Sequence, residues 1–305
     1  MSYIATTLEG LEEVTKEETK GKVIARGRIE FEKELFDLTS AKEIYKLIKK
    51  IEFKQITDIL NNLPELEVKE LGILCTRIGT HHFKSVDVQY QMKAYLQAKG
   101  YTIDLKKKDP ILYIDIVDNT CFFGYLIKKE IYKRNYRIKL VADTVHPLIA
   151  NAALHLADYK KNDLLVDPFV MDGIIVIEAA LQKKGKVFGY GKNLRCAKVN
   201  AKIAKIDIEW GDYSLDWLDT KFKKESVKIV TYLPSVSKTK LENQVKTIYK
   251  DFFHQAEFIV KKEMVVIVRN KDFLKEYLTA FTLEKEYQTS LGETTYYILA
   301  LKRTI

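Results

Sequence analysis

Apolar and polar residues alternate through the first third of the 305-residue chain. The stretches YIATTL (3–8) and KVIARGRIEFE (22–32) have the two-residue period that is typical of half-buried strands. Residues 43–63 are predicted to form a helix, and the following Pro64 is a stop signal because proline cannot continue a helix. The pattern therefore predicts a small α+β unit over residues 1–60.

Residues 61–128 contain a second set of alternating segments. ELGILCTRIG (70–79) is predicted to form a strand, and residues 85–100 a helix that ends at Gly100, since glycine readily adopts the conformation that closes a helix. Further strands are predicted over residues 101–105, 111–119 and 120–129. A second compact unit is expected to end near Lys129.

The pattern changes after residue 145, where longer apolar segments alternate with short ones. Helices are predicted over residues 146–159, 174–184 and 194–205. Strands are predicted over residues 163–169, 185–191, 228–234, 264–270 and 294–303. Strands separated by helices indicate an α/β fold with a parallel sheet, in which ligands bind beyond the carboxyl ends of the strands.

Composition narrows the class of protein. Apolar residues make up 47% and charged residues 30% of the chain, as in soluble globular proteins. Cys75, Cys121 and Cys196 are too far apart for a zinc motif, so we expect reduced thiols and no metal. The first 13 residues are acidic and lack the apolar core of a secretory signal, and no apolar run is long enough to cross a bilayer. A cytoplasmic location is expected.

The net charge of +9 suggests a polyanionic partner, because clustered lysine and arginine release counterions from phosphates. Residues 128–139 hold six basic residues against one acid, and residues 183–205 hold eight and no acid. The second run, which includes Lys198 and Lys202, could extend the contact with such a partner, or it could be an exposed helix face. A lysine-rich surface of the thermophile type is the alternative.

Two segments combine basic and aromatic side chains. TRIGTHHFKS (76–85) places Arg77, His81, His82 and Lys84 around Phe83. Cations suit phosphates, and aromatic or imidazole rings stack on unpaired bases, so this segment is a candidate RNA contact. The alternatives are a solvated loop anchored by Phe83 and a metal site at the paired histidines.

The second segment, KEIYKRNYR (129–137), contains Lys133, Arg134, Tyr136 and Arg137. Guanidinium groups can grip phosphates while tyrosine rings stack on bases, which is a surface for RNA rather than for duplex DNA. A solvated linker face is the alternative.

The order of several short motifs resembles the THUMP-containing RNA methyltransferases. The motifs are GLEEV (10–14), TRIGTHHFKS, KRNYR (133–137), HPLIANAAL (146–154), and DPF followed by IEAAL. The resemblance implies a ferredoxin-like region (1–60), a THUMP RNA-binding domain (61–128), a basic linker (129–145) and a Rossmann-like S-adenosylmethionine domain (146–305). It also implies tRNA or rRNA guanine-N2 as the class of substrate.

The same resemblance implies a cofactor loop of the form Asp-Pro-Phe-Cys-Gly-Ser-Gly-Thr. Asp167, Pro168, Phe169 and Gly173 match this pattern, whereas Met171 replaces its middle glycine. We expect a positive φ at that position, which costs a residue with a Cβ about 1–2 kcal/mol.

Two further family positions are acids that hold the cofactor. Asp212 matches the acid near the adenine, but Gly191 stands where the family has an acid for the ribose. A lost charge-assisted contact costs about 1.5–3 kcal/mol. Asp172 and Asn193 are the residues that could compensate.

The family's catalytic motif is Asn or Asp, Pro, Pro and an aromatic residue, and this chain has Tyr232, Leu233, Pro234 and Ser235 in its place. We therefore expect a catalytically impaired homologue that binds tRNA, as the RNA-presenting subunit of a partner enzyme. One alternative is an active, divergent guanine-N2 methyltransferase that uses S-adenosylmethionine. The other is a protein-interaction scaffold.

Overall fold

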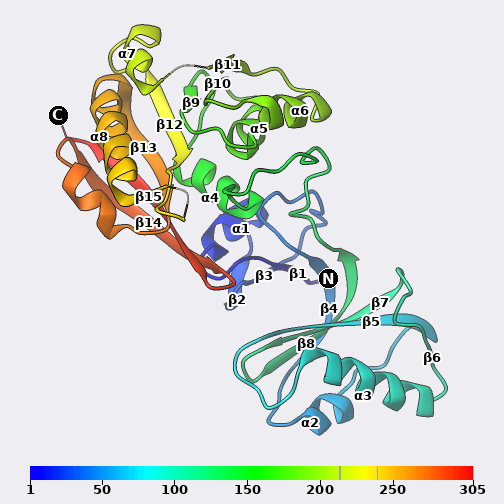
Figure 1. Ribbon diagram of the computed structural model, residues 1–305. Coiled ribbons are helices and arrows are strands. Elements are labelled where there is room, and N and C mark those ends of the chain that lie inside the picture. The colour runs from blue at the N-terminus through cyan, green and yellow to red at the C-terminus, as the bar shows by residue number, and fades with distance from the viewer. Residues whose placement is uncertain (213, 239, 305) are drawn as a thin grey trace. The chain divides into compact units, whose positions relative to one another are not determined.

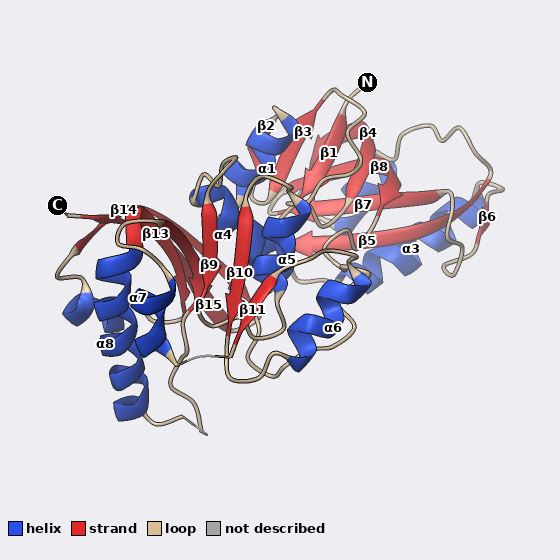
Figure 2. Cartoon of the chain, turned by 90° about the horizontal axis from the view of Figure 1, so that it is seen from above, coloured by secondary structure: helices blue, strands red, loops and turns tan. Residues whose placement is uncertain are grey.

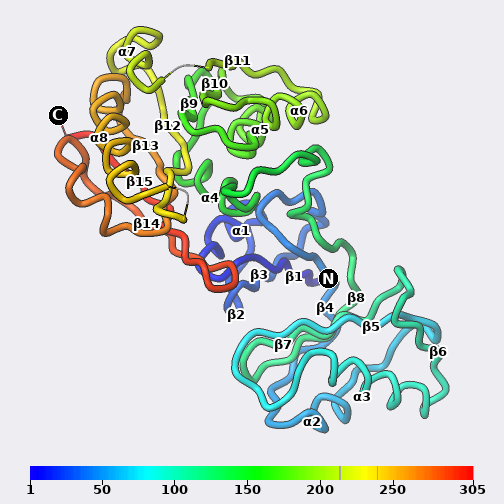
Figure 3. Tube along the Cα trace, in the orientation of Figure 1, coloured from blue at the N-terminus to red at the C-terminus, as the bar shows by residue number. Residues whose placement is uncertain are grey.

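The computed structural model describes residues 1–212, 214–238 and 240–304 (Figure 1). Contacts between Cα atoms divide the chain into two units, which can be followed along the trace in Figure 3. The first comprises Met1–Thr7 and Thr15–Ile131, and the second comprises Leu8–Val14 and the chain from Tyr132 onward. The helix α1 (Glu12–Thr19) runs from one unit into the other.

The first unit contains an eight-stranded sheet with the order β2-β3-β1-β4-β8-β7-β5-β6. Its strands are β1 (Tyr3–Thr6), β2 (Lys22–Ala25), β3 (Arg28–Phe31), β4 (Ile44–Glu52), β5 (Glu70–Ile78), β6 (Thr102–Ile103), β7 (Ile111–Val117) and β8 (Thr120–Lys128). β5 is parallel to β6 and β7, and the other neighbouring strands are antiparallel. The unit also contains the helices α2 (Ile56–Asn61) and α3 (Ser85–Ala98).

Helix α3 buries one side of its surface in the core of this unit. Val88, Met92 and Leu96 follow one another at four-residue intervals and are fully buried. They belong to the same core cluster as Leu71 of β5. Gly100 lies just beyond the helix with a φ of 81°, so the predicted helix and its glycine terminator are confirmed.

The predicted helix over residues 43–63 is wrong for its first half. Residues 44–52 form β4, and only Ile56–Asn61 is helical. β4 pairs with β1 on one side and with β8 on the other, so hydrogen bonds to two distant segments outweigh the local pattern. The pairing of β4 with β8 also joins residues 1–60 and 61–128 in one sheet. The division between units instead lies at 131–132, inside the predicted linker.

The second unit contains a seven-stranded sheet with the order β11-β10-β9-β12-β13-β15-β14. Figure 2 shows β10 between β9 and β11 in this sheet. Its strands are β9 (Leu164–Asp167), β10 (Lys186–Tyr190), β11 (Glu209–Gly211), β12 (Val227–Tyr232), β13 (Val260–Val268), β14 (Phe281–Leu291) and β15 (Thr294–Arg303). Its helical segments from residue 147 onward are α4 (Pro147–Leu156), α5 (Ile174–Leu181), α6 (Arg195–Ile203), η1 (Leu215–Trp217), α7 (Leu218–Lys221), α8 (Glu242–Ile259) and η2 (Asp272–Tyr277). The helices and strands predicted after residue 145 are confirmed.

β9, β10, β11, β12 and β13 are parallel, whereas β15 is antiparallel to β13 and β14. Alternate residues of β12 enter different core clusters. Val230 and Tyr232 lie in a cluster with residues of α4 and α5, and Ile229 lies in a cluster with residues of α8. Helices therefore cover both faces of the sheet, as in doubly wound folds. Because β9 has β10 on one side and β12 on the other, the strand order changes direction at β9.

Candidate functional site

A cavity of about 490 Å³ lies at the carboxyl ends of β9, β10 and β12, where the strand order changes direction. The residues that line it come from the loops after these strands, from the segment before α4, from the start of η1 and from α8. They are Val141, Pro168, Phe169, Val170, Met171, Gly191, Lys192, Asn193, Ser214, Leu215, Asp216, Pro234, Lys240, Ile248 and Asp251. The predicted cofactor residues Pro168 and Phe169 are thus in its wall.

Asp167 lies beneath the cavity at the end of β9 and is fully buried. One of its carboxylate oxygens accepts hydrogen bonds from the Thr231 hydroxyl at 2.6 Å and from the Phe169 backbone N–H at 3.0 Å. Burial raises the pKa of Asp167 to about 7, and these two hydrogen bonds only partly oppose the shift. Asp167 therefore shapes the turn after β9 rather than lining the cavity.

Met171 has a φ of 50°, in the left-handed region that was predicted for this position. Its side chain lines the wall and leaves the cavity open. Gly173 has a φ of 88° and precedes α5. A Cβ at Gly173 would lie 3.0 Å from Cβ of Ala197. The glycine therefore permits close packing against α6, and it is not among the residues that line the cavity.

Asp172 is fully buried behind this loop. Its carboxylate accepts hydrogen bonds from Nε of Arg137 at 2.7 Å and from the Thr144 hydroxyl at 2.6 Å. The Asn200 side-chain amide donates to the backbone carbonyl of Asp172 at 2.9 Å. The alternative in which Asp172 holds the cofactor is therefore wrong, because its carboxylate faces Arg137.

The end of β10 has no acid at the family position. Gly191 and Asn193 line the cavity, and Oδ1 of Asn193 accepts a hydrogen bond from the Arg195 backbone N–H at 3.3 Å. Asp212, the other predicted cofactor acid, is exposed and is not among the lining residues. The sequence reasoning missed Asp216 and Asp251, the two carboxylates that do line the cavity. No motif marks them, because they come from η1 and α8.

Three of the four residues at the degenerate catalytic motif are buried. The Tyr232 side chain is buried, and its hydroxyl donates to Asp143 at 3.1 Å. Burial raises the pKa of Tyr232 well above its usual range. Pro234 lines the cavity, but its carbonyl accepts a hydrogen bond from the Tyr249 hydroxyl at 3.0 Å. Leu233 is fully buried and Ser235 is half-buried.

The candidate RNA residues of the first unit lie at the end of β5 and before α3. Nη1 of Arg77 donates to the Gly79 carbonyl and to Nδ1 of His81, both at 2.9 Å. Nε2 of His81 lies 2.6 Å from the Asp118 carbonyl, so both ring nitrogens of His81 have partners. His82 and Lys84 are exposed. Phe83 packs against the core of the unit, and no cluster of metal-binding side chains occurs among the residues described.

The candidate RNA residues of the linker are largely internal. Arg134 donates to both carboxylate oxygens of Glu178 at 2.9 Å, and the Tyr136 hydroxyl donates to the same carboxylate. Arg137 is bound to Asp172. The structure therefore corrects the prediction that Arg134, Tyr136 and Arg137 face RNA, because buried carboxylates occupy these groups. Lys133, of the four residues named, is exposed.

The acid-free run 183–205 is also divided by the fold. Residues 183–186 lie at the amino end of β10, Lys192 lines the cavity at its carboxyl end, and Lys198 and Lys202 are on α6.

No helix within the described part of the chain is long and apolar enough to span a membrane.

Comparisons with known proteins agree with this arrangement. Residues 134–193 match the family of the RMKL-like methyltransferase domain. A tRNA (guanine(6)-N2)-methyltransferase of Methanocaldococcus jannaschii is 23% identical over 96% of this chain and 97% of its own length. A protein of the same name from Archaeoglobus fulgidus is 28% identical over 59% of this chain and 53% of its own length.

Solved structures share the fold over the whole chain. TrmN from Thermus thermophilus superposes with a TM-score of 0.81 at 20% identity and covers 99% of both chains. SMU.472, a methyltransferase-like protein complexed with SAH, superposes with a TM-score of 0.75 at 14% identity, over all of this chain and 98% of its own. The chain is therefore similar in sequence to tRNA guanine-N2 methyltransferases, contains a segment that matches an RMKL-like methyltransferase domain, and shares its fold with TrmN.

Proposed function

We propose that the chain is an S-adenosylmethionine-dependent methyltransferase that modifies a guanine N2 in tRNA. The observation that carries the proposal is the open cavity of about 490 Å³ at the switch point of the parallel sheet. Met171 departs from the family pattern, yet it leaves this volume free. The relatives named as tRNA (guanine(6)-N2)-methyltransferases support the reaction and the substrate class.

The lining suits an adenosyl cofactor. Phe169, Leu215 and Ile248 offer apolar walls for an adenine ring, and Asp216 and Asn193 offer acceptors for ribose hydroxyls. Gly191 leaves the backbone accessible beside them. S-adenosylmethionine would supply the methyl group, and these residues would hold it in place.

The target amine also needs an acceptor, which Tyr232 cannot provide because its hydroxyl is bound to Asp143. Asp251 lines the cavity on α8 together with Pro234. In the proposed reaction, a carboxylate oxygen of Asp251 accepts a hydrogen bond from the guanine amine, and it takes the proton that the amine loses. This role replaces the polar residue of the family motif.

The first unit supplies the RNA contacts in this proposal. His82 and Lys84 are exposed in the segment before α3. Ammonium groups suit phosphates, whereas an imidazole ring can stack on an unpaired base. We assign THUMP-type RNA binding to residues 61–128 on this basis.

A second candidate is a catalytically impaired homologue that binds tRNA and presents it to a partner enzyme. Two contacts favour it: the buried Tyr232 hydroxyl is bound to Asp143, and the Pro234 carbonyl is bound to Tyr249. Neither group is then available to a target amine. In this case Asp251 has no catalytic role.

Methyl transfer from labelled S-adenosylmethionine to bulk tRNA tests the two candidates, together with calorimetry for cofactor binding. Incorporation that stops when guanine N2 is already methylated supports the first. Tight tRNA binding with no incorporation at saturating cofactor contradicts the first and supports the second. Absence of both tRNA and cofactor binding contradicts both and leaves an interaction scaffold.

A further inference from the structure

Lysines gather at the amino ends of four neighbouring strands, on the edge of the second unit's sheet opposite to the cavity. The segments are residues 158–163 before β9, 183–186 before β10, 223–228 into β12 and 260–263 in β13. Together they contain ten lysines and four acidic residues. We call this set of segments the amino-edge surface.

Parallel pairing brings the four segments side by side. Lys186 is in register with Leu164, Lys228 with Leu165, and Val227 with Val260. The Lys186 backbone N–H also donates to the Asp163 carbonyl at 3.1 Å. Since neighbouring strands lie about 4.8 Å apart, the surface extends roughly 15 Å from β10 to β13.

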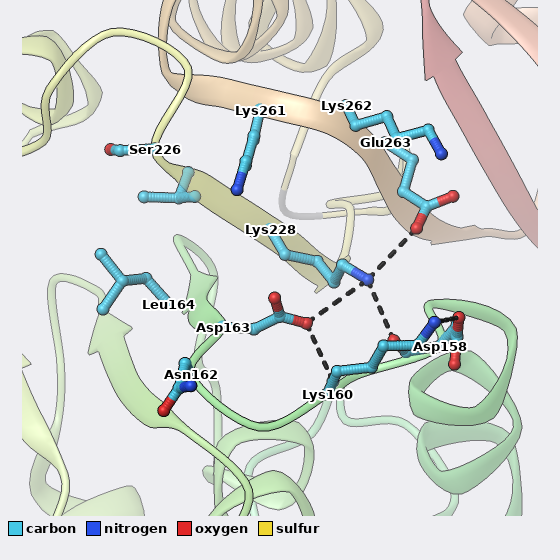
Figure 4. Close-up of a pocket in the computed structure, with 11 residues that line it drawn as sticks. Asp158, Lys160, Asn162, Asp163, Leu164, Ser226, Lys228, Lys261, Lys262 and Glu263 are labelled. Atoms are coloured by element: carbon cyan, nitrogen blue, oxygen red, sulfur yellow. Dashed lines mark hydrogen bonds and ion pairs between the residues drawn. The ribbon is translucent and has the colours of Figure 1, made fainter.

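Some of these lysines are neutralised within the surface. Nζ of Lys228 lies 3.1 Å from Glu263 and 3.6 Å from Asp163, and it forms the floor of a pocket of about 260 Å³ (Figure 4). Lys160 pairs with Asp158 at 2.6 Å. These ion pairs hold the Lys228 and Lys160 side chains in place at the pocket, and they involve three of the four acidic residues of the surface.

The remaining lysines face solvent, and little negative charge lies near them to compensate their positive charge. Seven lysines of the surface form no ion pair within the described part of the chain, and all seven are exposed. They are Lys161, Lys183, Lys184, Lys186, Lys223, Lys261 and Lys262. Figure 4 shows Lys261 extending from β13 toward the pocket. The fourth acid, Glu225, is shared between Lys224 at 3.5 Å and Arg303 at 3.0 Å. The surface is therefore strongly positive.

We propose that the amino-edge surface binds the phosphate backbone of RNA at a site separate from the cofactor cavity. Lysine ammonium groups are compact point charges that contact phosphate oxygens without reading bases, so the contact is independent of sequence. β9, β10 and β12 have four to six residues and separate the two edges of the sheet by roughly 13–20 Å. An RNA held at the amino edge can thus reach the cavity with another part of the same molecule. The choice of RNA as the partner rests on the proposed function.

The test compares two triple variants of the full chain. The first carries Lys186→Gln, Lys261→Gln and Lys262→Gln. The matched control carries Lys271→Gln, Lys275→Gln and Lys285→Gln, which removes the same charge from the start of η2, from η2 itself and from β14. Lys271 and Lys275 already have acidic partners there. Affinity for bulk tRNA is measured between about 50 and 200 mM salt.

The first variant is expected to lose roughly tenfold in tRNA affinity and to flatten the dependence of log K on log salt by about 2–3, since each lost phosphate contact contributes about 0.7–0.9. The control and a Lys→Arg triple at the first three positions should bind as wild type does. Calorimetry should give unchanged cofactor affinity, and melting temperature reports folding.

Equal affinity and equal salt slopes for the two Gln triples would overturn the inference even if the protein methylates tRNA. A flattened slope without any methyl transfer would support the inference and contradict the proposed function. Wild-type protein that binds anionic lipid vesicles but no tRNA would contradict both.

Discussion

The hydroxyl of Tyr232 lies 3.1 Å from a carboxylate oxygen of Asp143, which also accepts a hydrogen bond from Nη2 of Arg269 at 2.9 Å. The contact ties the end of β12 to the segment that precedes α4. Arg269 also lies over the rings of Tyr232 and Tyr296, at 5.8 and 5.7 Å. The position that carries the polar catalytic residue in the family is thus part of the core here.

Tyr232→Phe tests this structural role. We expect the free energy of unfolding to fall by about 1 kcal/mol, because one hydrogen bond is lost while Arg269 still satisfies Asp143. Methyl transfer should change by less than about threefold, since the hydroxyl does not reach the cavity. Denaturant unfolding and the transfer assay measure the two effects. A hundredfold loss of rate with unchanged stability would give Tyr232 a direct part in catalysis.

Gly191→Asp restores the acid that the family has at the end of β10. A Cβ at this position would lie 3.7 Å from Cδ2 of Leu194 and 3.9 Å from the Val170 backbone N, which are ordinary contacts. We expect affinity for S-adenosylmethionine to rise roughly 10- to 150-fold, as one charge-assisted hydrogen bond contributes about 1.5–3 kcal/mol. Calorimetry measures the change.

Gly189→Asp is the matched control for Gly191→Asp. Its Cβ would lie 2.7 Å from both Trp210 and Val170, so the same substitution should reduce stability rather than raise cofactor affinity. If Gly191→Asp leaves cofactor affinity unchanged in a folded protein, the ribose does not lie at Gly191.

Arg137→Gln tests the buried pair with Asp172. Asp172 is fully buried and the Arg137 side chain is 14% exposed, so removal of one partner should cost about 3–5 kcal/mol of unfolding free energy. The salt dependence of tRNA binding should stay the same, because the guanidinium group faces a carboxylate of the chain itself. Stable protein with a flatter salt slope would restore Arg137 as an RNA contact.

The sequence predicted the methyltransferase-type sheet well because each buried strand and each helix there has a clear apolar period. The positive φ of Met171 could also be predicted, since the family pattern places a glycine there. Strand β4 could not be predicted from the sequence, because its conformation depends on pairing with β1 and β8. Helix α8 was not predicted, although its sequence has a helical pattern. Val245, Tyr249 and Phe252 recur at helical spacing and lie on one buried face.

The linker shows why side-chain roles were harder to predict than the fold. KRNYR has the composition of an RNA contact, but Glu178 and Asp172, which bind its arginines, lie 44 and 35 residues further along the chain. The sequence did contain one indication of this pairing, which is Glu178 within the otherwise apolar α5. A buried carboxylate needs a cation as its partner. Asp251 could not be found at all from a local motif.

Asp251→Asn separates the two candidate functions. If Asp251 accepts the guanine amine, the turnover rate should fall by about 10²–10³-fold, because an amide cannot take the proton. Affinity for tRNA should remain within about twofold. Asp216→Asn, on the other carboxylate of the cavity, should mainly raise the KM for the cofactor. Equal and small effects of both variants on turnover would remove Asp251 from the reaction.

Asp167→Asn should change how stability depends on pH. The pKa of Asp167 is about 7 in the folded protein, against an ordinary value of 3.8, so the folded state holds a proton that the unfolded state has released. Its contribution to stability is therefore complete below about pH 4 and is lost as the pH rises to 7, by up to about 4 kcal/mol. An asparagine keeps an acceptor for Thr231 and Phe169 and carries no charge, so the variant should be more stable than wild type at pH 8 and similar at pH 4. Urea unfolding at both pH values measures the difference. A variant that is less stable than wild type at pH 8 would mean that the buried carboxylate is charged and needed by the turn after β9.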